Sequence, residues 1–407
     1  MSSATPVLRV SPELRAAIYH FSVFGTNGAI SVYFGVWLAM RGIQPNEIGI
    51  VNAAPVLLML VVNQMVGRIA DRASDWRGVI IALSLLAGLV PVGLFFVSGF
   101  WGILLIWTLS IMPAFALVPI VDAATLRMTQ RRGTDFSTVR AWGTVGFMIS
   151  GIASGPIIGI FGDAAFVPLF VLLAVLRAAL SFQLPRFREA APAGGSVPRQ
   201  GATALRQVLK PWFVLCLLGL GVLYSTHGAF GAFAALQWTQ QGVPETLIGP
   251  LVGTMAASEA LMMFVWKRLN LRISARHIII FACFVAAFRW TALAFEPSLP
   301  VLFGLQALHA VTFAMGYLGG IYFIANWTSE HIAAEAQGFS YVLQQAMSVV
   351  ALLGMGLCYG ALGHWAWAVL GAYALLGAVL VWLSLRLQPP TASPADPETI
   401  PIADPAV

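Results

Sequence analysis

The sequence predicts an all-α integral membrane protein. Of its 407 residues, 59% are hydrophobic and only 9% are charged, whereas ordinary soluble domains carry about 25% charged residues. Such a chain has too few polar side chains to cover a soluble globule. A helix needs about 20 apolar residues to cross a bilayer, while the strands of membrane barrels are shorter and alternate in polarity. The apolar runs of this chain are long and unbroken, so we expect helices.

Twelve apolar runs are long enough to be transmembrane helices. In the first half of the chain we expect them at about 14–40, 47–67, 78–98, 102–127, 137–161 and 163–185. In the second half we expect them at about 211–238, 246–266, 277–295, 299–326, 337–362 and 364–387. Tryptophans at the ends of these runs are expected to anchor at the membrane interface, namely Trp76, Trp101, Trp238, Trp327, Trp365 and Trp367.

One polar segment, residues 186–210 with the run EAAPAGGSVP, divides the chain into two halves of six spans. We therefore expect an N-terminal six-helix half at 1–185, a cytoplasmic linker at 186–210, a C-terminal half at 211–388 and a disordered cytoplasmic tail at 389–407. Over residues 28–72, shifting the sequence by 200 residues gives seven identities, among them Gly28 with Gly228 and Arg68 with Arg268. The two halves are therefore expected to be pseudosymmetric repeats.

Positive charges indicate the topology. The chain has 22 lysines and arginines against 16 acids, a formal net charge of +6, and most of these basic residues fall at the termini and in alternate loops. By the positive-inside rule, both termini of this multi-pass chain face the cytoplasm, and we expect the inner membrane of a cell. The arginines do not gather on one soluble face, so no nucleic-acid partner is expected. We expect a monomer in the lipid bilayer.

The sequence contains no motif typical of an enzyme or an ATP-driven pump. Cys216, Cys283 and Cys358 all fall inside apolar runs, so we expect neither disulfides nor redox chemistry. The sequence contains no GxxxxGK[ST] loop for ATP and no HExxH or paired-cysteine metal site. We expect no cofactor, no metal and no enzyme activity, so any transport must be driven by gradients.

The stretch from Pro119 to Phe147 places two opposite charges in apolar surroundings. Asp122 and Arg140 lie within predicted spans, where an ionisable side chain is expensive and usually faces a partner or a water-filled cavity. The pair is either a structural tether between two helices or a clamp for solute. A guanidinium fork suits bidentate binding of a carboxylate, so Arg140 or Arg289 is the expected counterion of an anionic substrate.

The residues expected to couple transport to a proton lie in the second half of the chain. Glu259 lies near the middle of its span, where it either carries a proton or forms a static pair with Arg289. His309 shares a helical face with Gln306, Phe313, Gly316 and Gly320. It is expected to relay protons or bind substrate, with a hydrogen-bonded packing role as the alternative.

Further polar positions complete the expected substrate site. His227 aligns with Asn27 under the repeat shift, so both are expected to line one cavity, with Asn27 on a wet face of the first span beside His20, Phe24 and Ser31. Tyr341 and Gln344 form a polar strip that serves either substrate or helix packing. Trp142 and Trp238 could stack on an aromatic substrate. Arg177 is expected to reach the cytoplasmic interface.

The segment Gly67-Arg68-Ile69-Ala70-Asp71-Arg72 resembles the loop between the second and third helices of the major facilitator superfamily. That resemblance implies a twelve-helix transporter in which two six-helix halves rock about a central site, and it assigns Gly67, Arg68, Asp71 and Arg72 to a cytoplasmic gate. The arrangement Pro119, Asp122, Arg140, Gly143 and Gly146 resembles the sugar-binding helices of lactose permease. Glu259, Arg289 and His309 correspond in position to the proton-coupling cluster of that permease.

Over most of its length the chain resembles the 3-phenylpropionate permease family of proton symporters. The family's marks are Thr226-His227-Gly228-Ala229, Ser258-Glu259, Gln306 to Phe313 and Val139 to Gly143. Gln306 and Thr312 stand where lactose permease has a lysine and a glutamate. The resemblance therefore leaves proton coupling to Glu259 or Asp122, or implies that coupling is absent.

The sequence thus predicts a secondary active transporter for proton-coupled uptake of a small organic acid, aromatic or carboxylic, by alternating access. Three alternatives remain open: a nucleoside or oligosaccharide symporter, an exporter of drugs or metabolites, and a non-transporting receptor on a transporter fold.

Overall fold

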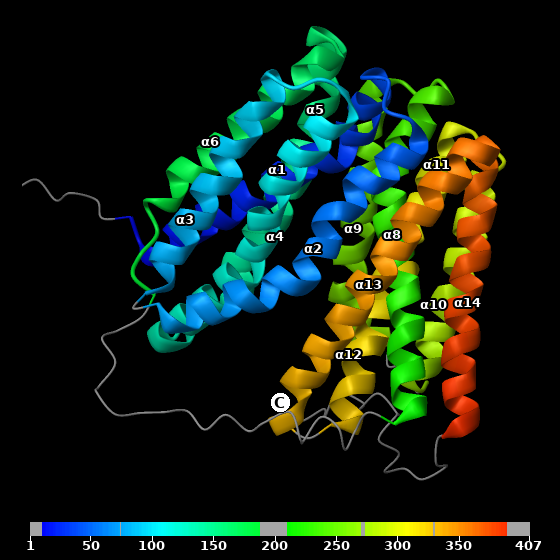
Figure 1. The fold of residues 1–407 in the computed structure, drawn as a ribbon. Coiled ribbons are helices and arrows are strands. Elements are labelled where there is room, and N and C mark those ends of the chain that lie inside the picture. Colours follow the sequence, from blue (N-terminus) through cyan, green and yellow to red (C-terminus); the bar gives the residue numbers. More distant parts are fainter. Residues whose placement is uncertain (1–9, 74, 188–209, 270–272, 329, 389–407) are drawn as a thin grey trace, which may run out of the picture. The chain divides into compact units, whose positions relative to one another are not determined.

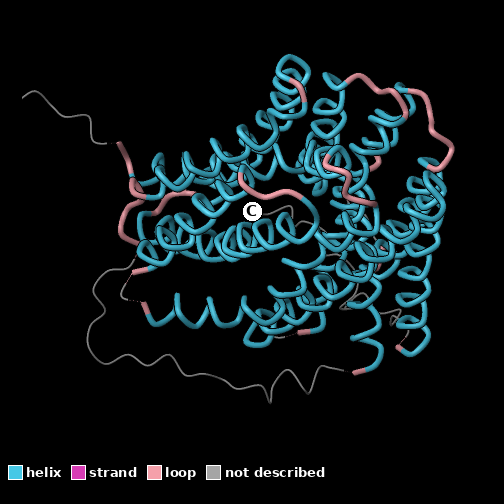
Figure 2. Tube along the Cα trace, turned by 45° about the horizontal axis from the view of Figure 1, so that its top comes forward, coloured by secondary structure: helices cyan, strands magenta, loops and turns pink. Residues whose placement is uncertain are grey.

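The computed structural model describes residues 10–73, 75–187, 210–269, 273–328 and 330–388, and their regular structure is helical (Figures 1 and 2). Within these ranges, ten helices are long and apolar enough to cross a membrane. One of the ten, Ala336–Leu387, contains two helices joined by a short turn, and Phe166–Ser181 is a further, shorter apolar helix. The expected all-α membrane architecture is confirmed, while the count of twelve spans stays a prediction.

The first half of the chain begins with α1 (Pro12–Met40) and α2 (Pro45–Arg72). It continues with α3 (Trp76–Leu89), the 3₁₀ segment η1 (Val90–Phe95), α4 (Gly99–Arg132), α5 (Phe136–Phe161), the 3₁₀ turn η2 (Asp163–Ala165) and α6 (Phe166–Ser181). Asp75 caps α3 by accepting the N–H of Arg77, and α4 ends at Gly133, whose φ of 65° closes the helix in the left-handed conformation.

The second half contains α8 (Pro211–Gln240), α9 (Glu245–Leu269) and α10 (Ala275–Leu293). A further helix is built from α11 (Leu299–Ala307), the π-helical segment η3 (Ala310–Met315) and α12 (Gly316–Trp327). The last two helices are α13 (Glu330–Leu362) and α14 (Ala366–Leu387), with the 3₁₀ turn η4 (Gly363–Trp365) between them. The expected linker 188–209 and tail 389–407 lie outside the described residues.

Two compact units make up the chain, and their boundary falls inside α1 and α2. The first unit contains α1 up to Ser31, α2 from Val61, and α3 to α6. The second contains Val32–Leu60 together with α8 to α14. Close backbone contacts hold this inserted piece within the second unit, because a Cβ at Gly49 would lie 2.6 Å from Leu352 O and one at Gly35 would lie 2.4 Å from Ala232 O.

In the first unit, α3 packs against α4 and α6. Its buried core joins α1, α3 and α4 through side chains such as Tyr19, Ile80 and Leu117. The backbones of α1 and α5 approach closely, because a Cβ at Gly146 would lie 2.2 Å from Phe21 O. Only glycine fits at this position, and the hydrogen bond from Ser150 Oγ to Gly25 O joins the same two helices.

In the second unit, α8 packs against α13 and α14, and α10 packs against α14. Arg276 in the first turn of α10 donates to the carbonyl of Ser384 near the end of α14. Arg77 in the first turn of α3 donates likewise to the carbonyl of Phe182 at the end of α6. The same kind of contact therefore closes the corresponding helix pair in each half, as expected of repeats.

Two expectations about interfacial side chains are wrong. Trp238 and Trp367 are buried rather than placed at a surface, since their rings pack against Phe230 of α8. Arg177 is buried as well, and its Nη2 donates to the carbonyl of Ala87 on α3 at 2.7 Å. Trp367 and Arg177 contact other helices, whereas Trp238 contacts a ring on its own helix, and the position of a residue within a span reveals neither kind of contact.

Candidate functional site

Two clusters of polar side chains lie inside the helices, one in each compact unit. We define the N-terminal cluster as His20, Phe24, Asp122, Thr125 and Arg140. We define the C-terminal cluster as His227, Glu259, Arg289, Gln306, His309 and Thr312. Among the described residues, no three His, Cys, Asp or Glu side chains come together in a way that could hold a metal ion.

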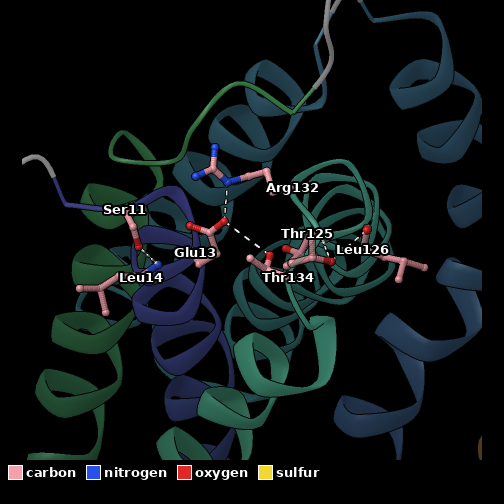
Figure 3. A network of polar contacts seen from close by, with 8 residues as sticks. Ser11, Glu13, Leu14, Thr125, Leu126, Arg132 and Thr134 are labelled. Carbon is pink, nitrogen blue, oxygen red and sulfur yellow. Dashed lines mark hydrogen bonds and ion pairs between the residues drawn. The ribbon is translucent and has the colours of Figure 1, made fainter.

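The N-terminal cluster is built on α4 and α5, which the turn at Gly133 joins. The helix α4 continues past Asp122 to Arg132, and α5 returns with Arg140 one turn inside its start. Figure 3 shows the side chains that fix this turn: Arg132 and Thr134 both reach Glu13 at the start of α1. The ion pair of Glu13 with Arg132 thus ties the α4–α5 corner to α1.

Asp122 and Arg140 meet as the sequence predicts. Arg140 Nε lies 3.2 Å from Asp122 Oδ1, and the guanidinium carbon lies 3.9 Å from the centre of the Phe24 ring. The Arg140 side chain remains 29% exposed. Its two terminal nitrogens make no hydrogen bond to the described residues, so the outer edge of the fork is open for a ligand. Phe24 and Asp122 hold the guanidinium in a fixed plane.

His20 completes the N-terminal cluster from α1. Its Nε2 lies 3.1 Å from Thr125 Oγ1, and its Nδ1 lies 3.8 Å from Asp122 Oδ1. His20 is only 1% exposed, so the expectation that it lies on a wet face is wrong. Phe24, Asn27 and Ser31 on the same helix are half-buried. The burial follows from packing of α1 against α4, where Thr125 is also buried.

The C-terminal cluster gathers on α8, α9, α10 and the π-helical segment. His309 immediately precedes η3 and Thr312 lies within it. A π-helical turn widens the helix by one residue and is frequently found at functional sites. Both side chains thereby reach α10, where Arg289 contacts them. Gly316 and Gly320, next along this helix, face Leu223 and Leu220 of α8.

Arg289 is the centre of this cluster. Its Nη2 donates to Gln306 Oε1 at 2.7 Å, and its Nη1 donates to Thr312 Oγ1 at 3.1 Å and to His309 Nδ1 at 3.3 Å. The guanidinium carbon also lies 5.1 Å from the centre of the Phe230 ring. Arg289 is 0% exposed. Both ends of its fork are therefore committed to protein groups, unlike those of Arg140.

The directions of these hydrogen bonds determine which ring nitrogen carries the hydrogen in His309 and in His227. A guanidinium can only donate, so His309 Nδ1 must accept, and a neutral His309 carries its hydrogen on Nε2. Likewise a carbonyl can only accept, so His227 Nδ1, 3.1 Å from Leu223 O, must donate. His227 Nε2 then accepts the hydroxyl hydrogen of Thr312 at 3.0 Å. Thr312 thus connects Arg289 to His227 in one directed chain.

Glu259 contacts His309 at the edge of the cluster. Its Oε2 lies 3.5 Å from His309 Nε2, and its side chain is 34% exposed. The alternative of a static pair between Glu259 and Arg289 is not what the contacts favour, because Arg289 directs its terminal nitrogens at Gln306, His309 and Thr312. Within the C-terminal cluster, Glu259 is an ionisable side chain that is also partly exposed, so it can exchange a proton with its surroundings.

Other predicted site residues lie outside these two clusters. Trp142 on α5 and Tyr341 on α13 are both about half exposed, and Gln344 donates to Ser340 on its own helix. Asn27 is half-buried on α1. For the predicted gate, Gly67, Arg68, Asp71 and Arg72 fall in α2, but their side chains lie outside the described residues.

Sequence reasoning missed two contributors. Thr125 was not singled out, and Thr312 was noted only as a departure from lactose permease. Helical spacing could have revealed Thr125, since it follows Asp122 by three residues on one helix. The sequence carries no such signal for Thr312, because its contact with both Arg289 and His227 depends on the π-helical turn.

Comparison with known proteins agrees with this architecture. The family model described as "MFS_1 like family" matches residues 14–374. A protein of Escherichia coli (strain K12) named "Probable 3-phenylpropionic acid transporter" is 26% identical over 370 residues, covering 88% of this chain and 94% of that protein. The "Maltose permease" of Geobacillus stearothermophilus is 25% identical over 375 residues, covering 90% of each.

Solved structures share the fold. The crystal structure of nucleoside transporter NupG matches with a TM-score of 0.79 at 15% identity, covering 93% of this chain and 100% of that one. A bacterial homologue of the human lysosomal transporter Spinster matches with a TM-score of 0.71 at 14% identity, covering 92% and 96%. This protein is a multi-pass membrane protein and a secondary transporter rather than an enzyme, and it belongs to the MFS_1-like family of the major facilitator superfamily.

Proposed function

We propose that this protein takes up a small organic acid together with a proton. In this proposal Arg140 binds the carboxylate of the substrate and Glu259 carries the proton. The chain would lie in the inner membrane with both termini in the cytoplasm, as the distribution of its arginines favours. A substrate of the phenylpropionate type fits the resemblance to a relative named for 3-phenylpropionic acid.

The contrast between Arg140 and Arg289 is the observation that carries the proposal. Both lie within apolar helices, but Arg289 is fully buried and uses both ends of its fork on protein groups. Arg140 is held through Nε by Asp122 and is 29% exposed. Its free edge offers two parallel N–H groups, the arrangement that a carboxylate accepts best. Arg140 is therefore the better counterion, and Asp122 is its positioning partner.

The proton assignment rests on the directed hydrogen bonds of the C-terminal cluster. A second proton on His309 would point an N–H at the Arg289 guanidinium, and one on His227 would displace the Thr312 hydroxyl hydrogen. Both histidines are therefore held in the neutral form by their neighbours. Glu259 faces His309 Nε2 and is partly exposed, so it is the group that can gain and lose a proton during transport.

A second candidate is a symporter of neutral sugars or nucleosides. Asp122 favours this reading, because its partly exposed carboxylate beside Arg140 can bind a pair of hydroxyl groups. The relative named for maltose is consistent with it. In this case Asp122 and Arg140 would contact the substrate equally, whereas an acid substrate would contact Arg140 and avoid Asp122.

Ligand-dependent thermal stability of the purified protein in detergent separates the two candidates. A ligand that binds only the folded state raises Tm by mass action. We expect 3-phenylpropionate to raise Tm, and the matched alcohol 3-phenylpropanol, maltose and uridine to leave it unchanged. Arg140→Gln should abolish the rise, whereas Arg127→Gln, an exposed arginine of the same helix hairpin, should retain it.

The opposite result would exclude the acid. If maltose or uridine raises Tm and the rise is lost in both Asp122→Asn and Arg140→Gln, the protein binds neutral hydroxyl-bearing solutes. If 3-phenylpropanol stabilises the protein as well as the acid does, the carboxylate is not recognised and the role of Arg140 is wrong.

A further inference from the structure

A basic pocket lies at the end of the first compact unit where α1 and α3 begin and α6 ends. Figure 1 shows these three helix ends meeting, with the chain after α6 passing the starts of α1 and α3. A cavity of about 460 Å³ opens there, and its lining includes Val10, Arg15, Arg77, Phe182 and Arg186. None of these residues belongs to either polar cluster, and the proposed transport reaction does not use them.

Three guanidinium groups border this pocket. Arg77 Nη2 donates to Phe182 O at 2.7 Å, and Arg15 Nη1 donates to Gln183 O at 3.4 Å. Each guanidinium has five N–H donors, so most of them remain after these bonds. The Nε atoms of Arg15 and Arg77 are buried without a hydrogen-bond partner among the described residues. Arg186 is exposed and makes no hydrogen bond within the described part of the chain.

Nearby carboxylates are already engaged. Asp75 accepts the backbone N–H of Arg77 and that of Phe187, so it caps α3 and the chain after α6. Glu13 pairs with Arg132, as Figure 3 shows. The pocket therefore concentrates positive charge with little neutralisation from the described acids. Partly buried guanidinium groups in this state favour an anionic ligand with several acceptor oxygens.

The position of the pocket along the helices points to the membrane surface. The apolar spans Pro12–Met40 and Trp76–Phe95 begin at this level, and the apolar helix Phe166–Ser181 ends there. Val10 and Phe182, both about half exposed, provide an apolar rim beside the charges. Basic pockets between transmembrane helices at this depth suit phosphate headgroups, and the apolar rim suits the start of an acyl chain.

We propose that this pocket binds a phosphate-bearing anion, the chemistry shared by the headgroup of an acidic phospholipid and free phosphate. A purely structural role would be capping of the α6 carbonyl ends by Arg15 and Arg77. Arg186 distinguishes the two roles, because it borders the pocket but caps nothing. Removing its charge should therefore weaken the ligand without weakening the fold.

The test titrates the full-length protein in neutral detergent with three probes and follows Tm. The probes are phosphatidylglycerol, phosphatidylcholine as the zwitterionic control, and inorganic phosphate. The proteins are wild type, Arg186→Gln, the double variant Arg15→Gln/Arg77→Gln, and Arg127→Gln as a matched control. Arg127 is an exposed arginine of α4 outside the pocket, so it corrects for general loss of positive charge.

We expect phosphatidylglycerol to stabilise wild type and Arg127→Gln more than phosphatidylcholine does. Arg186→Gln should keep the Tm of the unliganded protein but need roughly tenfold more phosphatidylglycerol for the same shift, as expected for loss of one charge-assisted contact. Stabilisation by inorganic phosphate at similar concentrations would identify a free anion as the ligand. If Arg186→Gln and Arg127→Gln respond alike to every probe, or if no probe stabilises the protein, the pocket is not an anion site.

Discussion

Nη1 of Arg289 lies 3.3 Å from Nδ1 of His309, and this contact determines which nitrogen of the histidine carries the proton. Because the guanidinium can only donate, the hydrogen of neutral His309 lies on Nε2, toward Glu259. Arg289, buried in the second half, thus orients the groups around it, whereas Arg140, partly exposed in the first half, is open to a ligand. The predictions below separate these two roles.

Replacing each arginine by glutamine should affect different properties. Arg289→Gln leaves Gln306, His309 and Thr312 without their buried donor, at about 1–3 kcal/mol for each group left unsatisfied. Its Tm in detergent should fall strongly. Arg140→Gln breaks one partly exposed pair, so Tm should fall less than in Arg289→Gln while affinity for the acid is lost. Equal losses of Tm in the two variants would contradict the assignment of a structural role to Arg289 and a ligand-binding role to Arg140.

Thr312 should matter through its hydroxyl group rather than its shape. Thr312→Val keeps the volume but cannot link Arg289 to His227, leaving a buried donor and acceptor unsatisfied at about 1–3 kcal/mol. Thr312→Ser retains the hydroxyl and should keep most of the stability and transport. Tm and initial uptake rates of both variants measure this. Indistinguishable valine and serine variants would mean that the directed hydrogen bonds are unimportant.

Gly146 should tolerate no side chain. A Cβ there would lie 2.2 Å from Phe21 O, so Gly146→Ala must push α1 and α5 apart near Phe24 and Arg140. Gly304 is the matched control, since a Cβ at Gly304 meets nothing within 4 Å. Alanine in an open helical position gains up to about 1 kcal/mol over glycine. Gly304→Ala should therefore leave Tm unchanged or raise it, and Gly146→Ala should lower it. A Gly146→Ala protein as stable as wild type would show that this close approach is absent.

Much of the fold could be predicted from the sequence because long apolar runs have few solutions in a bilayer. The pairing of Asp122 with Arg140 was also predictable, since the two charges lie on consecutive helices at similar distances from the Gly133 turn. Burial was harder to predict. Trp238 lies at the end of a span but is buried, and its ring packs edge-to-face against Phe230 on the same helix.

The C-terminal cluster shows why the rest of the site could not be predicted. Helical spacing placed Gln306 and His309 on one face, and both contact Arg289. The role of Thr312 depends on the π-helical segment Ala310–Met315, whose sequence contains no proline or glycine to mark it. Arg289 contacts this segment through Thr312, and no single-sequence pattern predicts that tertiary contact.

Proton-driven uptake by wild type and Glu259→Gln in proteoliposomes tests the central claim most directly. Both proteins are given labelled 3-phenylpropionate with and without an inward proton gradient, and exchange against internal unlabelled acid controls for substrate binding. Glutamine can still accept the N–H of His309 but cannot carry a proton. The account predicts gradient-driven accumulation in wild type, and exchange without accumulation in Glu259→Gln. Accumulation by Glu259→Gln that responds to the gradient as wild type does would contradict it.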